Sequence, residues 1–462
     1  MRDGEDRVEG GGAVELVEER APLRGSLGAS SSRWARVQIA ERPPPLLALA
    51  LGEHLWLESL GSSASGRCLS LSSPVRALAC RDADPNAPSL LLGTLSGDLA
   101  LLSSSQPRPA WLSASRALSA CTSLAWQPPA FSSFAAAFHD GSLFLIGPVR
   151  DPSPSCATTR DSLKPPSRLL HFRRSSLTHA TWNPSGSLLA LTRRDGSVTV
   201  LRIGSSPSDP TRDPFENGYH IDADLLPSSH SQPSLHEAKS GASASSRHRK
   251  ANSSSNASEE SHSPLVNEEG GFQCYYGAAL CAAWSPDGAL LAAGGECDQA
   301  ELFIPDINGV VAWMCGHVSF VSSLAFIERV EALQESNGAA KSTVQKYRLA
   351  GAGHDGQVLL WDIPVDSTAF QCKCRPIGVQ PPVRLGNVPT VSPTLHIDAH
   401  SSPVASLHLL SDGLLSVSCF GNIKKWRFRR AKERMKAHDC VENDHVDNRD
   451  DKQVRRVGTV SM

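Results

Sequence analysis

Two sets of residues in the C-terminal part of the chain include side chains that a hydrolytic triad would need. The first set is His317, Asp355 and Trp361, with Gly351 at the place where a serine would complete it. A hydrolase would also need a nucleophile on a sharp strand-to-helix turn and an oxyanion site, and no such motif accompanies these residues. Buried polar side chains that satisfy one another's hydrogen bonds can have the same composition. We therefore interpret this set as a structural network.

The second set is His400, Ser416 and Trp426, with Phe420 where the aspartate would stand. Both sets follow one order along the chain: a histidine before a strand, a small residue in the next strand, a turn residue, and a tryptophan in the third strand. We interpret the second set as structural as well. We expect no catalytic residue, and we predict that the protein is not an enzyme.

Motifs for metals, cofactors and phosphate groups do not stand out either. The 12 cysteines include no Cys-x-x-Cys pair, and Cys372 and Cys374 are too close together to form half of a zinc site. Asp-Gly dipeptides such as Asp140-Gly141 are typical of hairpin turns rather than metal sites. The segment Gly351–Gly353 precedes a strand turn and not a helix, so it does not indicate a phosphate site. We expect no metal, no cofactor and no small-molecule substrate.

The composition argues against several classes of partner. A formal net charge of -2 gives no general attraction to nucleic acid or to an anionic membrane surface. Most cysteines lie in apolar strand patterns, where a thiol packs as a small hydrophobic group, so we expect a reduced, intracellular protein. The charged N-terminus and the lack of a long apolar run indicate neither secretion nor membrane spanning. We expect the protein in the cytoplasm, in the nucleus or in both.

A repeat of short apolar segments must position the two polar sets. One copy runs from Leu280 to Ile304, and the next runs from Gly316-His317 to Trp361-Asp362. Each copy has an apolar strand, a turn, a strand of small residues, an acidic or glycine turn, and an apolar strand that ends in an aromatic residue. This order is typical of a β-propeller blade, and the Gly-His and Trp-Asp pairs are marks of WD repeats.

The spacing of the repeat predicts the number of blades. Equivalent positions at Cys80, Trp126, Trp182, Trp284 and Phe326 are separated by 46, 56, 102 and 42 residues. The long interval contains a tract of 67 residues, 204–270, that is rich in serine, histidine and proline, and its removal leaves 35 residues. That remainder is close to one blade of about 40 residues. We predict an all-β, seven-bladed WD-repeat β-propeller with a long disordered insertion and disordered termini.

The predicted domain limits follow from this pattern. They are a disordered N-terminus (1–30), blades one to four (31–203), a Ser-rich disordered insertion (204–270), blades five to seven (271–428), and a charged disordered tail (429–462). We expect two smaller insertions, at Glu328–Lys346 and at Asp366–Leu395. A strand near Val37 should complete the sheet that contains Trp426 and close the ring, while Ala13–Val17 is a second candidate strand.

Three aromatic residues lie in loops that the repeat places outside the core. Phe320 comes directly before the inner strand of one blade, and Tyr275 and Tyr276 lie in the comparable loop of the preceding blade. Neighbouring blades should therefore present Tyr276 and Phe320 side by side at the narrow end of the propeller. We predict that Tyr276, Phe320 and Tyr275 bind a partner protein, because exposed aromatic anchors dominate many interfaces. The alternative is that one or both fold inward and plug the channel.

Four segments carry a closer resemblance to a known family: Tyr275–Gly288, Gly316–Val321, Tyr347–Asp362 and Gly421–Trp426. They resemble the WD-repeat family that contains the fungal carbon-catabolite-repression WD protein and the animal dystrophia myotonica-type WD-repeat proteins. The resemblance extends over about Cys121 to Trp426. Phe303 departs from it, since the family usually has tryptophan at that blade end.

The resemblance implies a non-catalytic protein that binds a ubiquitin-specific protease and raises its activity. A second WD-repeat protein is a further candidate partner. It also implies that Tyr276 and Phe320 occupy the aromatic contact positions. Phe320 stands where tryptophan is common in the family, which keeps an apolar anchor but removes an indole N–H.

Other functions remain open. A substrate receptor of a ubiquitin ligase often carries Trp-Asp-x-x-Arg, whereas Trp361-Asp362 is followed by Ile363, Pro364 and Val365. A general protein-interaction scaffold is a further alternative. An RNA-associated scaffold would need a basic face, and the basic clusters lie in the insertion (Arg247–Lys250) and the tail.

Overall fold

The computed structural model describes residues 14–19, 36–40, 46–59, 67–81, 89–103, 109–112, 119–129, 131, 133–146, 167–172, 175–203, 221–222, 266–334, 342–364 and 388–430. The expectation of a disordered tail falls on residues outside this set from position 431 onward. Most of the expected Ser-rich insertion also lies outside the described residues.

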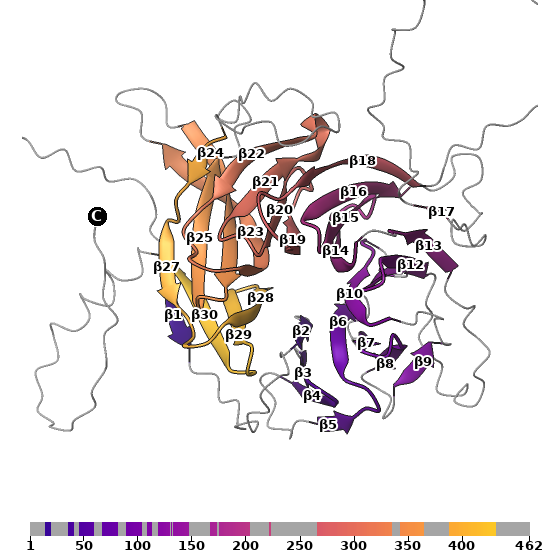
Figure 1. Ribbon diagram of the computed structural model, residues 1–462. Helices are drawn as coiled ribbons and strands as arrows, with labels where there is room; N and C mark the ends of the chain where they lie inside the picture. The colour runs from indigo at the N-terminus through magenta and orange to yellow at the C-terminus, as the bar shows by residue number, and fades with distance from the viewer. Residues whose placement is uncertain are drawn as a thin grey trace, which may run out of the picture.

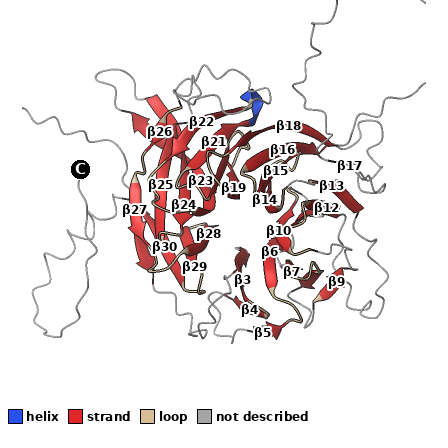
Figure 2. Ribbon diagram, in the orientation of Figure 1, coloured by secondary structure: helices blue, strands red, loops and turns tan. Residues whose placement is uncertain are grey.

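The described strands form seven sheets arranged as a ring (Figures 1 and 2). Each sheet has four antiparallel strands in order from an inner to an outer strand, and two of the sheets have a fifth, parallel strand. The inner strands of successive blades contact one another, and the last of them contacts the first, so the ring is closed. The prediction of an all-β, seven-bladed propeller is confirmed. Within the described residues, no helix has the length and apolar character needed to cross a membrane.

Blades one to three come from the N-terminal part of the chain. Blade one contains β2 (Arg36–Ala40), β3 (Leu46–Leu51), β4 (His54–Ser59) and β5 (Arg67–Ser70). Blade two contains β6 (Val75–Arg81), β7 (Ser89–Thr94), β8 (Leu99–Ser103) and β9 (Ala110–Leu112). Blade three contains β10 (Cys121–Trp126), β11 (Phe134–Phe138), β12 (Ser142–Ile146) and β13 (Ser167–His171), and β17 (Ile221–Asp222) adds a parallel fifth strand.

Blades four and five follow. Blade four contains β14 (Leu177–Trp182), β15 (Leu188–Arg193), β16 (Ser197–Ile203) and β18 (Val266–Gln273). Blade five contains β19 (Ala279–Trp284), β20 (Leu291–Gly295), β21 (Ala300–Ile304), a 3-10 turn η3 (Pro305–Ile307) and β22 (Gly309–Met314), and β26 (Thr390–Val391) pairs with β22 in parallel.

Blades six and seven complete the ring. Blade six contains β23 (Val321–Gln334), β24 (Ser342–Gly353), β25 (Gln357–Pro364) and β27 (Leu395–Asp398). Blade seven contains β28 (Val404–Leu410), β29 (Gly413–Ser418), β30 (Ile423–Arg430) and β1 (Val14–Glu19).

The strand that closes the ring is β1, not the strand near Val37. β1 pairs with β30 from Val14 opposite Arg430 to Glu19 opposite Lys425. The strand around Val37 is instead the inner strand of blade one, where it pairs with β3. Only residues 41–45 separate these two strands, and such a short connection favours a hairpin between neighbours. The prediction that residues 1–30 are disordered is therefore wrong for Val14–Glu19.

The predicted insertions also contain strand segments. Residues 328–334 and 342–346 continue β23 and β24 as a paired hairpin that ends with Gln334 opposite Ser342. This hairpin was not predicted because its sequence is polar and lacks the apolar alternation of a strand. Backbone hydrogen bonds can extend a pair of strands without an apolar face. Blade four's outer strand begins at Val266, inside the range predicted as the Ser-rich insertion. β26 and the start of β27 fall within the insertion predicted after β25.

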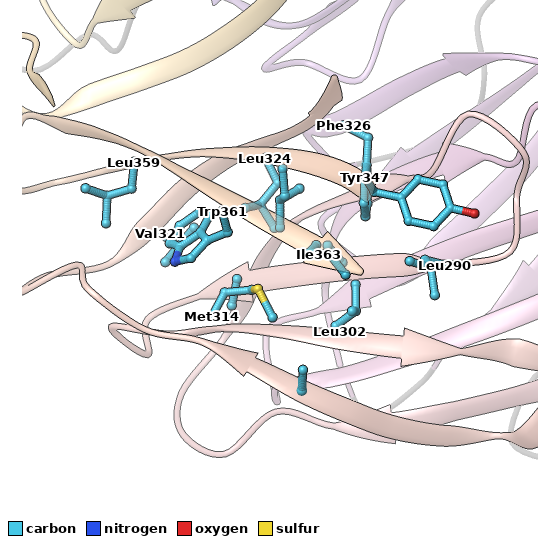
Figure 3. Packing of buried hydrophobic residues seen from close by; sticks show 14 of the residues in the cluster. Leu290, Leu302, Met314, Val321, Leu324, Phe326, Tyr347, Leu359, Trp361 and Ile363 are labelled. Carbon is cyan, nitrogen blue, oxygen red and sulfur yellow. The ribbon is translucent and has the colours of Figure 1, made fainter. Parts of the chain in front are cut away.

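The core lies between neighbouring blades, as the packing of blade five against blade six illustrates (Figure 3). Leu302 and Met314 of blade five pack in one cluster with Val321, Leu324 and Trp361 of blade six. Trp361 is completely buried in this cluster. A single blade would leave one apolar face exposed, so each blade depends on the next for its stability.

Indole hydrogen bonds connect four successive blades. Trp126 Nε1 donates to the carbonyl of Ala79 in blade two over 3.3 Å, and Trp182 Nε1 donates to the carbonyl of Ala125 over 3.2 Å. Trp284 Nε1 donates to the carbonyl of Thr181 over 3.1 Å. Each tryptophan ends the inner strand of its blade and reaches back to the inner strand of the preceding one. These indoles thus fix how neighbouring blades are aligned.

We predict that Trp182→Phe lowers the free energy of unfolding by about 1–2 kcal/mol, because it removes a buried hydrogen bond and reduces packing. Urea unfolding measures the change. Trp111→Phe is the matched control, since Trp111 is exposed on β9, and we expect it to change stability by less than about 0.5 kcal/mol. Equal stability of Trp182→Phe and the wild-type chain would contradict the role given to the indole.

Candidate protein-interaction surface

The first polar set forms a buried network in blade six. His317 Nδ1 lies 2.9 Å from Asp355 Oδ2, and both side chains are almost completely buried. The backbone N–H of Val318 donates to the same carboxylate oxygen over 3.0 Å. Burial lowers the pKa of His317, although the Asp355 carboxylate opposes that shift. The network joins the loop that enters blade six to the turn between β24 and β25.

Gly351 explains why this network has no hydroxyl. A Cβ atom at Gly351 would lie 2.6 Å from the Trp361 ring, so the indole occupies the space that a serine would need. Trp361 Nε1 donates instead to the carbonyl of Cys315 over 2.9 Å, and His317 Nε2 has no hydrogen-bond partner. No serine stands among these residues, and their hydrogen bonds hold the loop before β23 against the turn between β24 and β25.

The second polar set is assembled in blade seven. His400 Nε2 lies 2.9 Å from Ser416 Oγ, and Trp426 Nε1 donates to the same oxygen over 2.8 Å. Ser416 is completely buried, which keeps its hydroxyl away from any substrate. Blade six thus has the carboxylate without the hydroxyl, and blade seven has the hydroxyl without the carboxylate. Within the described part of the chain, no group of three or more His, Cys, Asp or Glu side chains is placed to hold a metal ion.

The three predicted aromatic residues lie on one face of the ring. The described loops from an outer strand to the next inner strand open on this face, as do the turns between the second and third strands of each blade. Tyr275 and Tyr276 lie in the loop before β19 and are each 70% exposed. Phe320 lies in the loop before β23 and is 39% exposed. None of the three is sealed in the core, and β19 and β23 are neighbouring inner strands.

Two carboxylates hold the loop that carries the tyrosines. The Tyr275 N–H donates to Glu301 Oε1 over 2.8 Å, and the Ala278 N–H donates to Glu296 Oε2 over 3.0 Å. Gly277 has φ +69°, and a Cβ there would lie 2.6 Å from Glu296 Cβ, so the tight turn requires glycine. The Tyr275 ring also lies 6.2 Å from the ring of Trp313. The loop is therefore fixed before any partner binds, which lowers the entropic cost of binding.

Glu301 is an acidic residue at a buried position of a strand. It lies in β21 opposite Trp313 of β22 and is only 5% exposed. Burial raises the pKa of its carboxyl group to about 7, and the hydrogen bond from Tyr275 opposes that rise. Its role was not predicted, because a glutamate followed by Leu-Phe-Ile looks like the solvent-facing residue of an ordinary strand.

Phe320 is supported by the turn between β24 and β25. The His354 N–H donates to the carbonyl of Phe320 over 2.9 Å, and the two rings lie 5.3 Å apart. Asp355, the next residue of this turn, belongs to the buried network with His317. The Phe320 anchor is thus connected directly to the structural network of its blade.

The same face carries exposed apolar residues that sequence reasoning missed as contact sites. Val318 lies two residues before Phe320, Phe420 lies in the turn between β29 and β30, and Leu95 lies in the turn between β7 and β8. The signal was available for Phe420, because it replaces the aspartate of the network in a turn that continues with Gly421 and Asn422. The exposed apolar residues of blades five to seven therefore form an arc along one face.

Comparisons with known proteins agree with the fold and give a limited indication of function. No family model matches the chain. The UBP9-binding protein bun62 of Schizosaccharomyces pombe is 23% identical over 193 residues, which cover 34% of this chain and 34% of that protein. The match thus spans about a third of the relative's length. A chain in the crystal structure of the mitotic checkpoint complex has a TM-score of 0.51 at 14% identity, over 93% of this chain and 99% of that one. This likeness shows the fold alone.

We predict that Gly351→Ala lowers the free energy of unfolding by about 1–3 kcal/mol, because the added methyl group would overlap the buried Trp361 ring. Thermal or urea unfolding measures the loss. Ala350→Gly tests the neighbouring position, where a loss of backbone rigidity and a small cavity are the only effects. A Gly351→Ala variant as stable as the wild-type chain would show that the indole does not occupy that space.

A second prediction concerns Glu301→Gln and pH. The pKa of Glu301 is raised from 4.5 to about 7 in the folded state, so the folded chain binds a proton that the unfolded chain has released between these values. This contribution to stability is complete below pH 4.5 and is lost as pH rises through about 7. Glutamine keeps an oxygen for the Tyr275 N–H and does not titrate. The variant should therefore gain stability relative to wild type between pH 5 and pH 8, as measured by urea unfolding at both values. A constant difference would contradict the assignment.

Proposed function

We propose that this protein is a non-catalytic WD-repeat scaffold that binds a ubiquitin-specific protease through the face bearing Tyr275, Tyr276 and Phe320 and raises its activity. The observation that carries the proposal is the pair of rigid loops that present exposed aromatic rings from neighbouring blades. Aromatic anchors on a rigid support are the usual energetic centre of a protein interface. The name of the yeast relative, a UBP9-binding protein, points to the class of partner.

Activation needs no catalytic residue from the propeller. The scaffold raises the protease's activity if it binds the active conformation of the enzyme more tightly than the inactive one. The rigid face is suited to that task, because a preformed surface selects one conformation of its partner instead of adapting to several. A second WD-repeat protein in the complex and a location in the cytoplasm or nucleus are parts of the same proposal.

The alternative functions have less support. For a ligase substrate receptor, Trp361 is completely buried, and Asp362 forms two hydrogen bonds with Arg348 of the same blade, at 2.6 and 3.0 Å. For an RNA scaffold, Lys425 and Arg427 of β30 both contact Asp412. These ion pairs reduce the positive charge that Lys425 and Arg427 offer to RNA.

The test is binding and activation of purified ubiquitin-specific proteases by the full chain, with hydrolysis of a fluorogenic ubiquitin substrate as the readout. We expect the double variant Tyr276→Asp, Phe320→Asp to weaken binding at least about 100-fold and to abolish activation, since two anchors would carry buried charge. Its thermal unfolding should stay near that of wild type, because both side chains are exposed.

Trp111→Asp is the matched control, because Trp111 is a comparably exposed aromatic residue on the outer strand of blade two. It should leave binding and activation unchanged. Wild-type binding by the double variant would remove the two aromatic residues from the proposed interface, and a chain that binds no ubiquitin-specific protease would overturn the proposed function itself.

A further inference from the structure

The turn between β29 and β30 has the same backbone geometry as the corresponding turn of blade six. The side chain before its glycine, however, is exposed instead of buried. Gly421 has φ +83° and donates its N–H to the carbonyl of Ser418 over 2.9 Å, as Gly356 (φ +80°) does to Gly353 over 3.2 Å. In blade six the residue before the glycine is Asp355, which is buried against His317. In blade seven it is Phe420, which is 52% exposed. The fold does not need an apolar side chain there, and together with the exposed Val318 and Phe320 of blade six it extends the apolar part of this face.

A depression of about 470 Å³ lies beside this turn. Its polar lining comes from the end of β27, the loop that enters blade seven and the start of β30: Asp398, His400, Ser401, Ser402, Asn422 and Lys424. The Cys419 N–H donates to the carbonyl of Pro403 over 2.8 Å, which ties the turn of Phe420 to this loop. Phe420 and the depression therefore form one unit.

This unit is continuous with the support of Phe320. The carbonyl of Gly356 accepts the N–H groups of Ala399 and His400, over 3.1 and 2.9 Å. Gly356 belongs to the same turn as His354, whose ring lies against Phe320. A partner that covers Phe320 and His354 thus reaches the depression next along the rim.

The lining of the depression contains one ammonium group and one carboxylate, among hydroxyl and amide groups that both donate and accept hydrogen bonds. Lys424 holds its ammonium group 5.7 Å above the Trp426 ring, and Asn422, Ser401 and Ser402 add neutral donors. The one carboxylate in the lining, Asp398, already accepts a hydrogen bond from the Gln357 amide over 3.2 Å. The carboxylate of an aspartate or glutamate side chain is the acceptor that matches Lys424 and the Asn422 amide, since Lys424 would bind it through a charge-assisted hydrogen bond.

We propose that Phe420 and this depression form a second docking point for the same ubiquitin-specific protease, taking a segment with an apolar side chain next to an acidic one. The apolar side chain packs on Phe420, and the carboxylate binds Lys424 and Asn422. This inference rests on the proposed function and extends the interface from blades five and six to blade seven.

The test measures the affinity of the full chain for a ubiquitin-specific protease that the wild-type chain binds. We expect Phe420→Ala and Lys424→Glu each to weaken binding about tenfold, and the loss with Lys424→Glu should shrink at high salt. Because Lys424 also contacts Trp426, Asn422→Asp serves as a second charge variant that leaves this contact in place, and it should act in the same direction. Trp111→Ala is the control and should keep wild-type affinity.

Each outcome separates this inference from the proposed function. Wild-type affinity in both Phe420→Ala and Lys424→Glu would overturn the second docking point and leave the aromatic face as the only contact. Tighter binding by Lys424→Glu would show that the depression takes a cation at Asp398 and would overturn the acidic segment. Loss of protease binding by the wild-type chain itself would overturn the proposed function and this inference together.

Discussion

Mutual burial of neighbouring blades is the constraint on which the rest of this structure depends. The cluster around Trp361 combines residues of blades five and six, so neither blade has a complete core alone. Closure of the ring gives the first and last blades the neighbours that they would otherwise lack. This packing also fixes the described loops that carry Tyr275, Tyr276 and Phe320, because the strands that they join are buried against the neighbouring blades.

The two polar networks show that a blade can keep its structure when one hydrogen-bonding residue of the network is replaced. In blade six, Gly351 leaves room for the Trp361 ring, and the indole hydrogen bond moves to the carbonyl of Cys315. In blade seven, Ser416 serves both His400 and Trp426 while the aspartate is missing. The missing carboxylate leaves its turn free to carry Phe420. The residue before the turn glycine is thus buried in blade six and exposed in blade seven, although the backbone of the turn is the same.

Much of the fold was predictable, because apolar alternation and Asp-Gly turns recur at nearly constant spacing. The pairing of the closing strand was not: Ala13–Val17 was a second candidate for a strand, but Val14–Glu19 is short, charged and far in sequence from its partner. The hairpin extension of β23 and β24 was missed because its sequence is polar. Exposure of Tyr276 and Phe320 followed from their place in the repeat, but the buried carboxylate of Glu301 did not, since sequence alone does not show which face of a strand is covered.

Closure of the ring by β1 also determines the order in which the molecule can be completed. Its partner β30 is more than four hundred residues further along the chain, so β1 can take its place only after β30 has been synthesised. Until then the outer edge of β30 has no partner, and the nascent β1 segment is open to pairing with the wrong edge. Such a distant contact makes folding slow, and the sheet of blade seven is completed only once the chain has been made at least as far as Arg430.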